Sequence, residues 1–348
     1  MLILDGGMGT ELENRGIDSS DPLWLTLWSA KFLLPINSEF LNCIKSRDQW
    51  TVDQINEANR ALDEHPEWLE SPEDTSNLLY QIHKDYVLAG ADIITSASYQ
   101  ASLEGTTQAG AVRSWPGALW MLRKSEQLVH KAIKDANVDR KVLLAASVGP
   151  FGAWLGGGQE YSGDYTGYTK EDIRRHHGFK IRVLLGGGPD MLLIETIPSL
   201  VEVQVLVDVL NSLDPSLSIP VCLALSVKTT DNGKTTLADG SELSSIADLA
   251  ASCPSFTHLG VNCCAETVAK DALSLLQQHT SLKLVAYPNS GEVYNGATKT
   301  WSGDSSSSFL DAATLSDWQT SVSILGGCCR TSPPHIAFLR QRADELQS

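Results

Sequence analysis

The chain has 348 residues, of which 42% are apolar and 20% are charged, and its formal net charge is −16. This composition is typical of a globular protein with a sizeable hydrophobic core, and the length still fits one large α/β barrel. The acidic balance, without a Lys/Arg-rich run, argues against binding to nucleic acid or to anionic membranes, because both attract positive charge.

The N-terminal sequence and the cysteine count indicate a cytoplasmic protein. Residues 1–7 lack the basic start and long apolar stretch of a secretion signal. Apolar runs such as residues 191–194 are far shorter than the roughly 20 residues that cross a bilayer. The 7 cysteines form an odd set in a long chain, which fits a reducing compartment better than a disulfide framework.

Short apolar runs alternate with segments of helical period along most of the chain. The predicted strands are residues 2–5, 92–95, 142–146, 191–195, 221–225, 258–261, 284–286 and 322–325. The predicted helices are residues 77–89, 118–136, 170–185, 200–213, 242–251, 265–279 and 334–346. Right-handed crossovers join such repeats into a parallel sheet that closes into a (β/α)8 TIM barrel. We expect one barrel domain over residues 1–348.

The connection after the first predicted strand is unusually long. Within it, residues 31–72 contain Pro35, Pro66 and Pro72 and an acidic helical stretch at residues 52–64. Loops of this length in compact domains are usually lids or other functional insertions. We therefore expect residues 31–72 to be an insertion or lid within the barrel domain.

Polar or glycine-rich residues follow every predicted strand. These phrases begin at Asp5, Ser96, Ser147, Glu195, Ser226, Asn262, Pro288 and Gly326. In a barrel all of them converge on the face where active sites lie, at the carboxyl ends of the strands. Each phrase alone is equally well explained by turn formation. Together they predict the rim of one pocket.

Four cysteines stand in two adjacent pairs, Cys263-Cys264 after the sixth predicted strand and Cys328-Cys329 after the eighth. The other three, in the insertion, in a strand and after a helix, are most simply small buried or incidental residues: Cys43, Cys222 and Cys253. The two pairs are far apart along the chain, so only a closed fold brings them together.

Three of the paired cysteines predict a metal site. Adjacent side chains of an extended strand point to opposite faces, so Cys328 and Cys329 share a target only where the chain turns, and the preceding Gly-Gly pair supplies that turn. Cys263 is the first residue past its strand mouth, whereas Cys264 lies one step away. Three thiolates and one open position make a zinc site of the catalytic kind.

The paired cysteines are also compatible with a vicinal disulfide between Cys328 and Cys329, or with a structural zinc closed by four ligands, with Cys264 assisting. A catalytic zinc with three thiolates is a poor activator of water but suits the binding of a further thiol, which it keeps deprotonated. A thiolate attacks an electrophilic methyl group, so the catalytic site predicts alkyl transfer to sulfur.

Several phrases, in order along nearly the whole chain, resemble one known family. They are residues 4–12 (LDGGMGTEL), 90–100, 195–198 (ETIP), 260–263 (GVNC), 287–294 and 326–331 (GGCCRT). In combination they are similar to the zinc-dependent homocysteine S-methyltransferases, particularly the members that use S-methylmethionine or S-adenosylmethionine. The family pattern lacks residues 31–72.

The resemblance implies a barrel whose zinc is held by Cys263, Cys328 and Cys329, which agrees with the spacing argument. It also implies that Asp5 and Glu195 hold the ammonium group of homocysteine, as carboxylates paired with a cation.

Further substrate contacts are predicted beside these acids. Asn262 and the backbone amides of Gly6 and Gly7 would orient the homocysteine carboxylate, because glycine lets the backbone come close. The same residues are also compatible with simple turn formation. Tyr99 matches the family's aromatic residue beside the metal.

A sulfonium methyl donor carries positive charge, which aromatic faces and carboxylates attract. Tyr287, Glu292 and Tyr294 are the candidate donor-binding residues, although the tyrosines are equally compatible with core packing. No glycine-rich dinucleotide fingerprint follows a strand, so an adenosyl donor would bind at the barrel mouth.

We expect a methyltransferase that moves a methyl group from a sulfonium donor to homocysteine and gives methionine, as in methionine biosynthesis. Its partners are small molecules, and it needs no catalytic group beyond the metal site. The alternatives are a related enzyme that uses betaine or accepts selenocysteine, and a non-enzymatic zinc- or redox-responsive binding protein.

Overall fold

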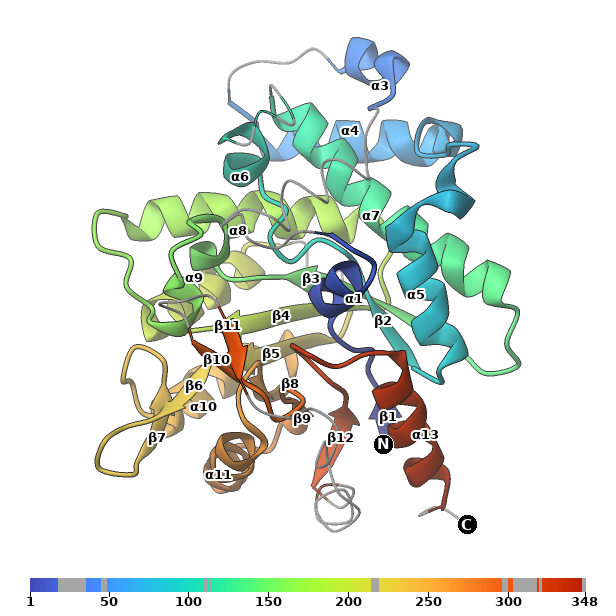
Figure 1. Ribbon diagram of the computed structural model, residues 1–348. Helices are drawn as coiled ribbons and strands as arrows, with labels where there is room; N and C mark the ends of the chain where they lie inside the picture. Colours follow the sequence, from blue (N-terminus) through green and yellow to red (C-terminus); the bar gives the residue numbers. More distant parts are fainter. Residues whose placement is uncertain are drawn as a thin grey trace.

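Eight parallel strands form the centre of the computed structural model, in the order β1-β12-β9-β8-β5-β4-β3-β2 (Figure 1). The structure describes residues 1–17, 36–44, 49–108, 110, 112, 114–213, 219–295, 300–302, 318 and 321–345. A parallel bridge between Leu4 and Ile93 joins the two ends of this order, beside β1 and in β2, and brings the sheet round into a barrel. The predicted fold is confirmed.

All the predicted strands are present, and β5 and β12 have the predicted bounds. The strands of the barrel are β1 (Leu2–Ile3), β2 (Ile93–Thr95), β3 (Leu143–Val148), β4 (Met191–Ile197), β5 (Val221–Leu225), β8 (Phe256–Asn262), β9 (Lys283–Tyr287) and β12 (Val322–Leu325). Two antiparallel pairs that the sequence did not predict are β6 (Val227–Thr229) with β7 (Thr235–Leu237), and β10 (Val293–Asn295) with β11 (Thr300–Ser302).

The predicted helices also form, within three residues of the expected bounds. They are α5 (Leu78–Leu88), α7 (Trp115–Ala136), α8 (Lys170–Leu185), α9 (Leu200–Asn211), α10 (Leu243–Ala251), α11 (Glu266–Gln277) and α13 (Pro333–Glu345). The other helical elements are α1 (Met8–Asn14), α3 (Ser38–Cys43), α4 (Val52–Glu64), α6 (Leu103–Gln108), η1 (Pro66–Trp68), η2 (Asp74–Ser76), η3 (Phe151–Trp154) and η4 (Gln159–Tyr161). Among the described helices, none has the length and hydrophobicity needed to cross a membrane.

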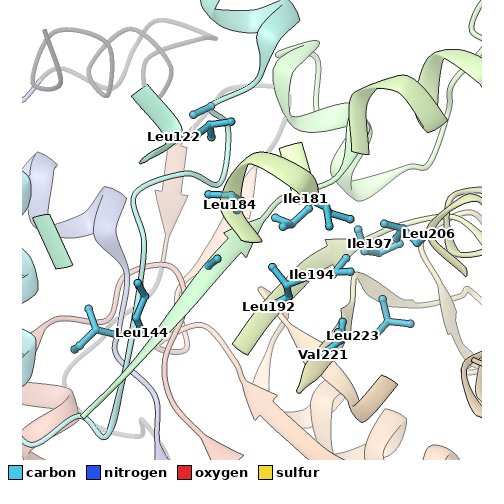
Figure 2. Packing of buried hydrophobic residues seen from close by; sticks show 14 of the residues in the cluster. Leu122, Leu144, Ile181, Leu184, Leu192, Ile194, Ile197, Leu206, Val221 and Leu223 are labelled. Carbon is cyan, nitrogen blue, oxygen red and sulfur yellow. The ribbon is translucent and has the colours of Figure 1, made fainter. Parts of the chain in front are cut away.

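The strands are apolar on both faces because each face is buried. Leu192 and Ile194 of β4 and Leu223 of β5 belong to the outer cluster, with Ile181 of α8 and Leu206 of α9 (Figure 2). The residues between them point inward, where a second cluster fills the barrel. This double burial explains the continuous hydrophobic runs that made the strands easy to predict.

The described part of residues 31–72 forms an outer layer of the fold. Helix α4 packs against α7 and α8, and Asn59 Nδ2 donates to Arg182 O at 3.2 Å. Phe40 of α3 is fully buried, and its ring centroid lies 6.3 Å from that of Trp68. Residues 31–35 and 45–48 lie outside the described residues, so the domain bounds and the lid role stay predictions.

We predict that this layer contributes to stability. Phe40→Ala should lower the free energy of unfolding in urea by about 3–5 kcal/mol, because it removes a buried ring and leaves a cavity. Leu41→Ala is the matched control, since Leu41 is 39% exposed on the same helix and its loss should cost under about 0.5 kcal/mol. Equal stabilities of the two variants would contradict the packing described above.

Candidate metal centre

Two loops carry the paired cysteines to one side of the barrel mouth. Cys263 follows β8 and Cys328 follows β12, and β9 lies between these strands in the sheet. The segment after β9 ties both loops together, because Cys328 N donates to Pro288 O at 2.8 Å and Cys329 N donates to Asn289 Oδ1 at 3.1 Å. The closed sheet thus brings together residues that are far apart in sequence.

The sulfur atoms of Cys263, Cys328 and Cys329 all lie within 4.8 Å of one another, and those of Cys263 and Cys329 are 3.5 Å apart. A tetrahedral zinc with Zn–S bonds of about 2.3 Å places its sulfur ligands about 3.8 Å apart. The three thiols therefore fit a single zinc ion. Within the described part of the chain, no fourth His, Cys, Asp or Glu joins the group.

The remaining cysteines lie outside this group. Cys264 is buried in the outer hydrophobic cluster, where burial raises the pKa of its thiol. Cys328 and Cys329 are both free thiols, so the structure contains no vicinal disulfide between them. Cys222 and Cys253 are buried and Cys43 is exposed, as expected for cysteines without a role in the centre.

The backbone at the cysteines differs from the prediction in one respect. The turn lies at Cys329-Arg330, where Arg330 has a φ of 64°, and not at the preceding glycines. The glycines serve close packing instead: a Cβ on Gly327 would lie 2.5 Å from Thr331 Oγ1. Cys263 also has a positive φ, 54°, which turns the chain sharply after β8.

Hydrogen bonds among the clustered thiols shift their pKa values in opposite directions. Hydrogen bonds from the thiols of Cys328 and Cys329 lower the pKa of Cys263 well below its usual value. The same contact raises the pKa of Cys328, which loses its proton after Cys263. A metal ion would displace the remaining protons, so we expect metal affinity to increase with pH.

Asp5 and Glu195 lie buried near the metal centre. Asp5 accepts hydrogen bonds from Thr95 N at 2.8 Å and from Thr95 Oγ1, and Ser147 Oγ donates to Glu195. Burial raises the pKa of Asp5 to about 8 and that of Glu195 to about 7, and the charge of Glu195 adds to the rise at Asp5. An ammonium group between them would stabilise both carboxylates.

Glycine is required at two predicted substrate-binding positions. A Cβ on Gly6 would lie 2.8 Å from Thr331 Oγ1, and one on Gly7 would lie 2.7 Å from Cys328 O. The amide of Gly7 already donates to Thr331 Oγ1 at 3.1 Å. These glycines therefore let the first loop pack against the cysteine loop, and their contact with substrate stays a prediction.

Asn262 is fully buried and holds Thr196. Thr196 N donates to Asn262 Oδ1 at 2.9 Å, and Asn262 Nδ2 donates to Thr196 Oγ1 at 2.8 Å. Thr196 has a φ of 59°, a strained value that this pair of hydrogen bonds helps to maintain. The side chain of Asn262 thus orders the loop after Glu195, and its contact with substrate stays a prediction.

The predicted aromatic residues take different places. Tyr99 is half-buried near the metal centre, where the charges of Glu160 and Cys263 add to the rise that burial causes in its pKa. Tyr287 is buried in the cluster inside the barrel. Tyr294 belongs to β10, but its side chain lies outside the described residues.

Glu292 makes an ion pair. Its Oε2 accepts from Arg330 Nε at 2.7 Å, next to the cysteine loop. Arg330 also lies 3.2 Å from Glu13 Oε2, so it links the loop after β9 to α1. This position is compatible with the barrel mouth, and a role of Glu292 in donor binding stays a prediction.

Sequence reasoning missed one part of the centre, η4 in the loop after β3. Tyr161 Oη lies 3.3 Å from Cys263 Sγ, and Glu160 precedes it. The prediction considered only the first residues after each strand, and η4 begins eleven residues after β3. The signal that could have identified η4 is the acid Glu160 and the aromatic Tyr161, which follow shortly after the three glycines 156–158.

The fold and the site together define a metal-binding (β/α)8 barrel with a three-thiol centre at its mouth. The family model of homocysteine S-methyltransferases matches residues 2–343. The chain therefore belongs to the homocysteine S-methyltransferase family.

Several methyltransferases align with almost the whole chain. Homocysteine S-methyltransferase of Escherichia coli is 33% identical, with 99% of this chain and 95% of that protein covered. Homocysteine S-methyltransferase 4 of Zea mays is 32% identical, over 99% of this chain and 90% of that protein. Selenocysteine methyltransferase of Astragalus bisulcatus is 30% identical, over 96% of this chain and 90% of that protein.

A solved structure supports both the fold and the metal site. The metallated form of the homocysteine methyltransferase MmuM from Escherichia coli superposes with a TM-score of 0.72 at 31% identity, over 98% of this chain and 96% of that chain. Together with the sulfur geometry, this likeness supports a metal site at Cys263, Cys328 and Cys329.

We predict that the metal depends on the grouped cysteines alone. After loading with zinc and dialysis against metal-free buffer, Cys329→Ala should lose its bound metal, because two thiolates hold the ion far more weakly than three. Cys264→Ala, which changes the neighbouring buried cysteine, should keep one metal ion per chain. Atomic absorption of the purified proteins measures both, and retention of metal by Cys329→Ala would exclude this ligand set.

Proposed function

We propose that the protein is a zinc-dependent methyltransferase that transfers a methyl group from a sulfonium donor, S-methylmethionine or S-adenosylmethionine, to the thiol of homocysteine and gives methionine. The observation that carries the proposal is the group of three thiols at the barrel mouth, beside two buried carboxyl groups. Family membership and the activities named for the relatives support the reaction.

Zinc is the proposed metal because three cysteine sulfurs at these distances suit its tetrahedral geometry and its preference for thiolates. Bound to Cys263, Cys328 and Cys329, zinc would supply a fourth position at which a thiol is held and kept deprotonated near neutral pH. No general base is then needed from the protein.

The buried acids give homocysteine its orientation. Asp5 and Glu195, held by Thr95 and Ser147 respectively, would bind the ammonium group of the amino acid. Gly6, Gly7 and Asn262 order the surrounding loops and are proposed to orient its carboxylate. Fixing the amino acid in this way aligns its sulfur with the donor's methyl carbon, which replaces a bimolecular encounter by a positioned one.

The donor completes an in-line displacement. A bond forms between the homocysteine sulfur and the methyl carbon while the bond from that carbon to the sulfonium sulfur breaks, and its electron pair stays on the leaving sulfur. The positive charge disappears and two neutral thioethers result. Tyr99, Tyr287, Glu292 and Tyr294 are the residues proposed to face substrate and donor.

Cytoplasmic location and small-molecule partners complete the proposal. The free thiols of the centre must stay reduced to bind metal, which a reducing compartment ensures. Methionine formation places the reaction in amino-acid biosynthesis.

We predict that Cys328→Ala abolishes methionine formation from homocysteine and S-methylmethionine, because the thiol substrate is no longer held as a thiolate. Chromatography of the products measures the methionine, and Cys253→Ala serves as a control, since Cys253 is buried away from the centre. Full turnover by a metal-free Cys328→Ala protein would refute the proposed function.

Assays of the wild-type protein also test which methyl donor and which acceptor it uses. With homocysteine as the acceptor, equal amounts of S-methylmethionine, S-adenosylmethionine and betaine should be compared as donors. With the best of these donors, selenocysteine should then be compared with homocysteine as the acceptor. The similarity to a selenocysteine methyltransferase makes the second comparison necessary. Methylation with betaine alone would contradict the sulfonium donor.

We also predict that homocysteine binds better as pH rises. The raised pKa values of Asp5, about 8, and Glu195, about 7, leave both groups mostly protonated at pH 6. They ionise between pH 6 and 8.5, where the substrate ammonium is still charged, so the KM for homocysteine should fall across this range. Asp5→Asn should raise KM about 30-fold and flatten this dependence, because it removes one partner of a buried charge pair. A KM that rises with pH would contradict the assignment.

A further inference from the structure

The loop after β3 brings an acidic side chain to the metal centre. Tyr161 of η4 contacts Cys263 through its hydroxyl group, at 3.3 Å from Sγ, and this contact fixes the end of η4 against a metal ligand. Glu160 immediately precedes it, and the charge of Glu160 acts on the hydroxyl groups of Tyr99 and Tyr161. Glu160 therefore belongs to the wall of the same site.

Among the described residues, the carboxylate of Glu160 has no partner of opposite charge. Its Oε2 is shielded from solvent, and no described residue donates a hydrogen bond to it. The charged group that acts on it most strongly is Cys263, which is also an acid. A buried carboxylate beside thiolates is costly unless a cation joins it.

The loop that carries Glu160 is firmly anchored. Glu202 at the start of α9 is fully buried and accepts from Phe151 N at 2.6 Å and from the Tyr165 hydroxyl at 2.5 Å. His177 of α8 contacts the same carboxylate at 2.7 Å. These contacts lie on both sides of η4 along the chain, so they fix the position of the backbone that carries Glu160.

We propose that Glu160 is the residue that receives the positive charge of the methyl donor, and that Tyr161 positions it by anchoring η4 to Cys263. This inference rests on the proposed function, since it assigns the charge-recognising group for the sulfonium donor. It also supplies a cation for the shielded Oε2 of this half-buried side chain, which no described residue supplies. Glu292, the carboxylate that the sequence predicts for donor binding, is paired with Arg330, whereas Glu160 has no such cation among the described residues.

The chemistry sets the kinetic form of the effect. The sulfonium is fully charged in the bound donor and still carries much of its charge in the transition state, so a carboxylate at Glu160 stabilises both states to a similar extent. Glu160 therefore lowers the KM or Kd for the donor and has little effect on kcat. Its attraction ends with the transfer, which favours release of the neutral thioether.

A pair of ligands isolates the charge. S-methylmethionine and 2-amino-5-methylhexanoic acid have the same shape, but the second has carbon in place of the sulfonium sulfur. Calorimetry with the zinc-loaded full-length protein, without homocysteine, should show S-methylmethionine binding at least about tenfold more tightly. Equal binding of the two ligands to the wild-type protein would overturn the proposal without any variant.

Variants assign the effect to Glu160. In Glu160→Gln the preference for the charged ligand should fall to about one, and the KM for S-methylmethionine should rise about tenfold with kcat and the KM for homocysteine within twofold of wild type. Glu160→Asp should restore part of the preference, because it keeps the charge. Asp164→Asn removes a charge from an exposed position of the same loop and should behave as wild type.

The outcomes separate this inference from the proposed function. Zinc content and circular dichroism verify that each variant is folded and loaded. If the wild-type protein forms no methionine from any sulfonium donor, the proposed function fails. If it forms methionine but Glu160→Gln keeps the full preference for the charged ligand, the assignment of Glu160 fails while the function stands.

Discussion

The whole site depends on one geometric constraint, the approach of three sulfur atoms to within the span of a single ion. Two of these sulfurs follow β12 and the third follows β8, with β9 between them. Hydrogen bonds from the cysteine loops to Pro288 and Asn289 fix this approach. Two sulfurs bound to one ion by bonds of about 2.3 Å lie at most about 4.6 Å apart, so the closed barrel that brings the loops together is a condition of the chemistry.

Much of this arrangement follows from the sequence, for identifiable reasons. Apolar runs buried on both faces, such as β5 and β12, have clear boundaries, and adjacent cysteines at the ends of two strands have few roles open to them in a reduced protein. Closure of the barrel then requires no further information, because the βα alternation has one handedness.

Other features depend on contacts between distant residues and were therefore not predictable. The turn lies at Arg330, and Gly327 packs closely against Thr331; the Gly-Gly phrase alone reveals neither feature. Tyr161 reaches Cys263 from a loop whose path is set by Glu202, far along the chain. The hydrogen bonds from both ends of the Asn262 amide to Thr196 are not visible in the sequence, where Asn262 is predicted to contact substrate.

Charge explains how such an acidic site can select its substrates. Three thiolates carry more charge than one divalent metal ion, and Asp5, Glu195 and Glu160 add carboxyl groups in a poorly solvated space. Burial raises the pKa of each of these three acids, so without a cation the protein itself resists ionising them. In the proposed reaction, the ammonium group of homocysteine and the sulfonium group of the donor are the cations that the substrates supply. The amino acid's charge persists after transfer while the donor's charge vanishes, so the same electrostatic field that gathers the reactants holds the donor only until its methyl group has moved.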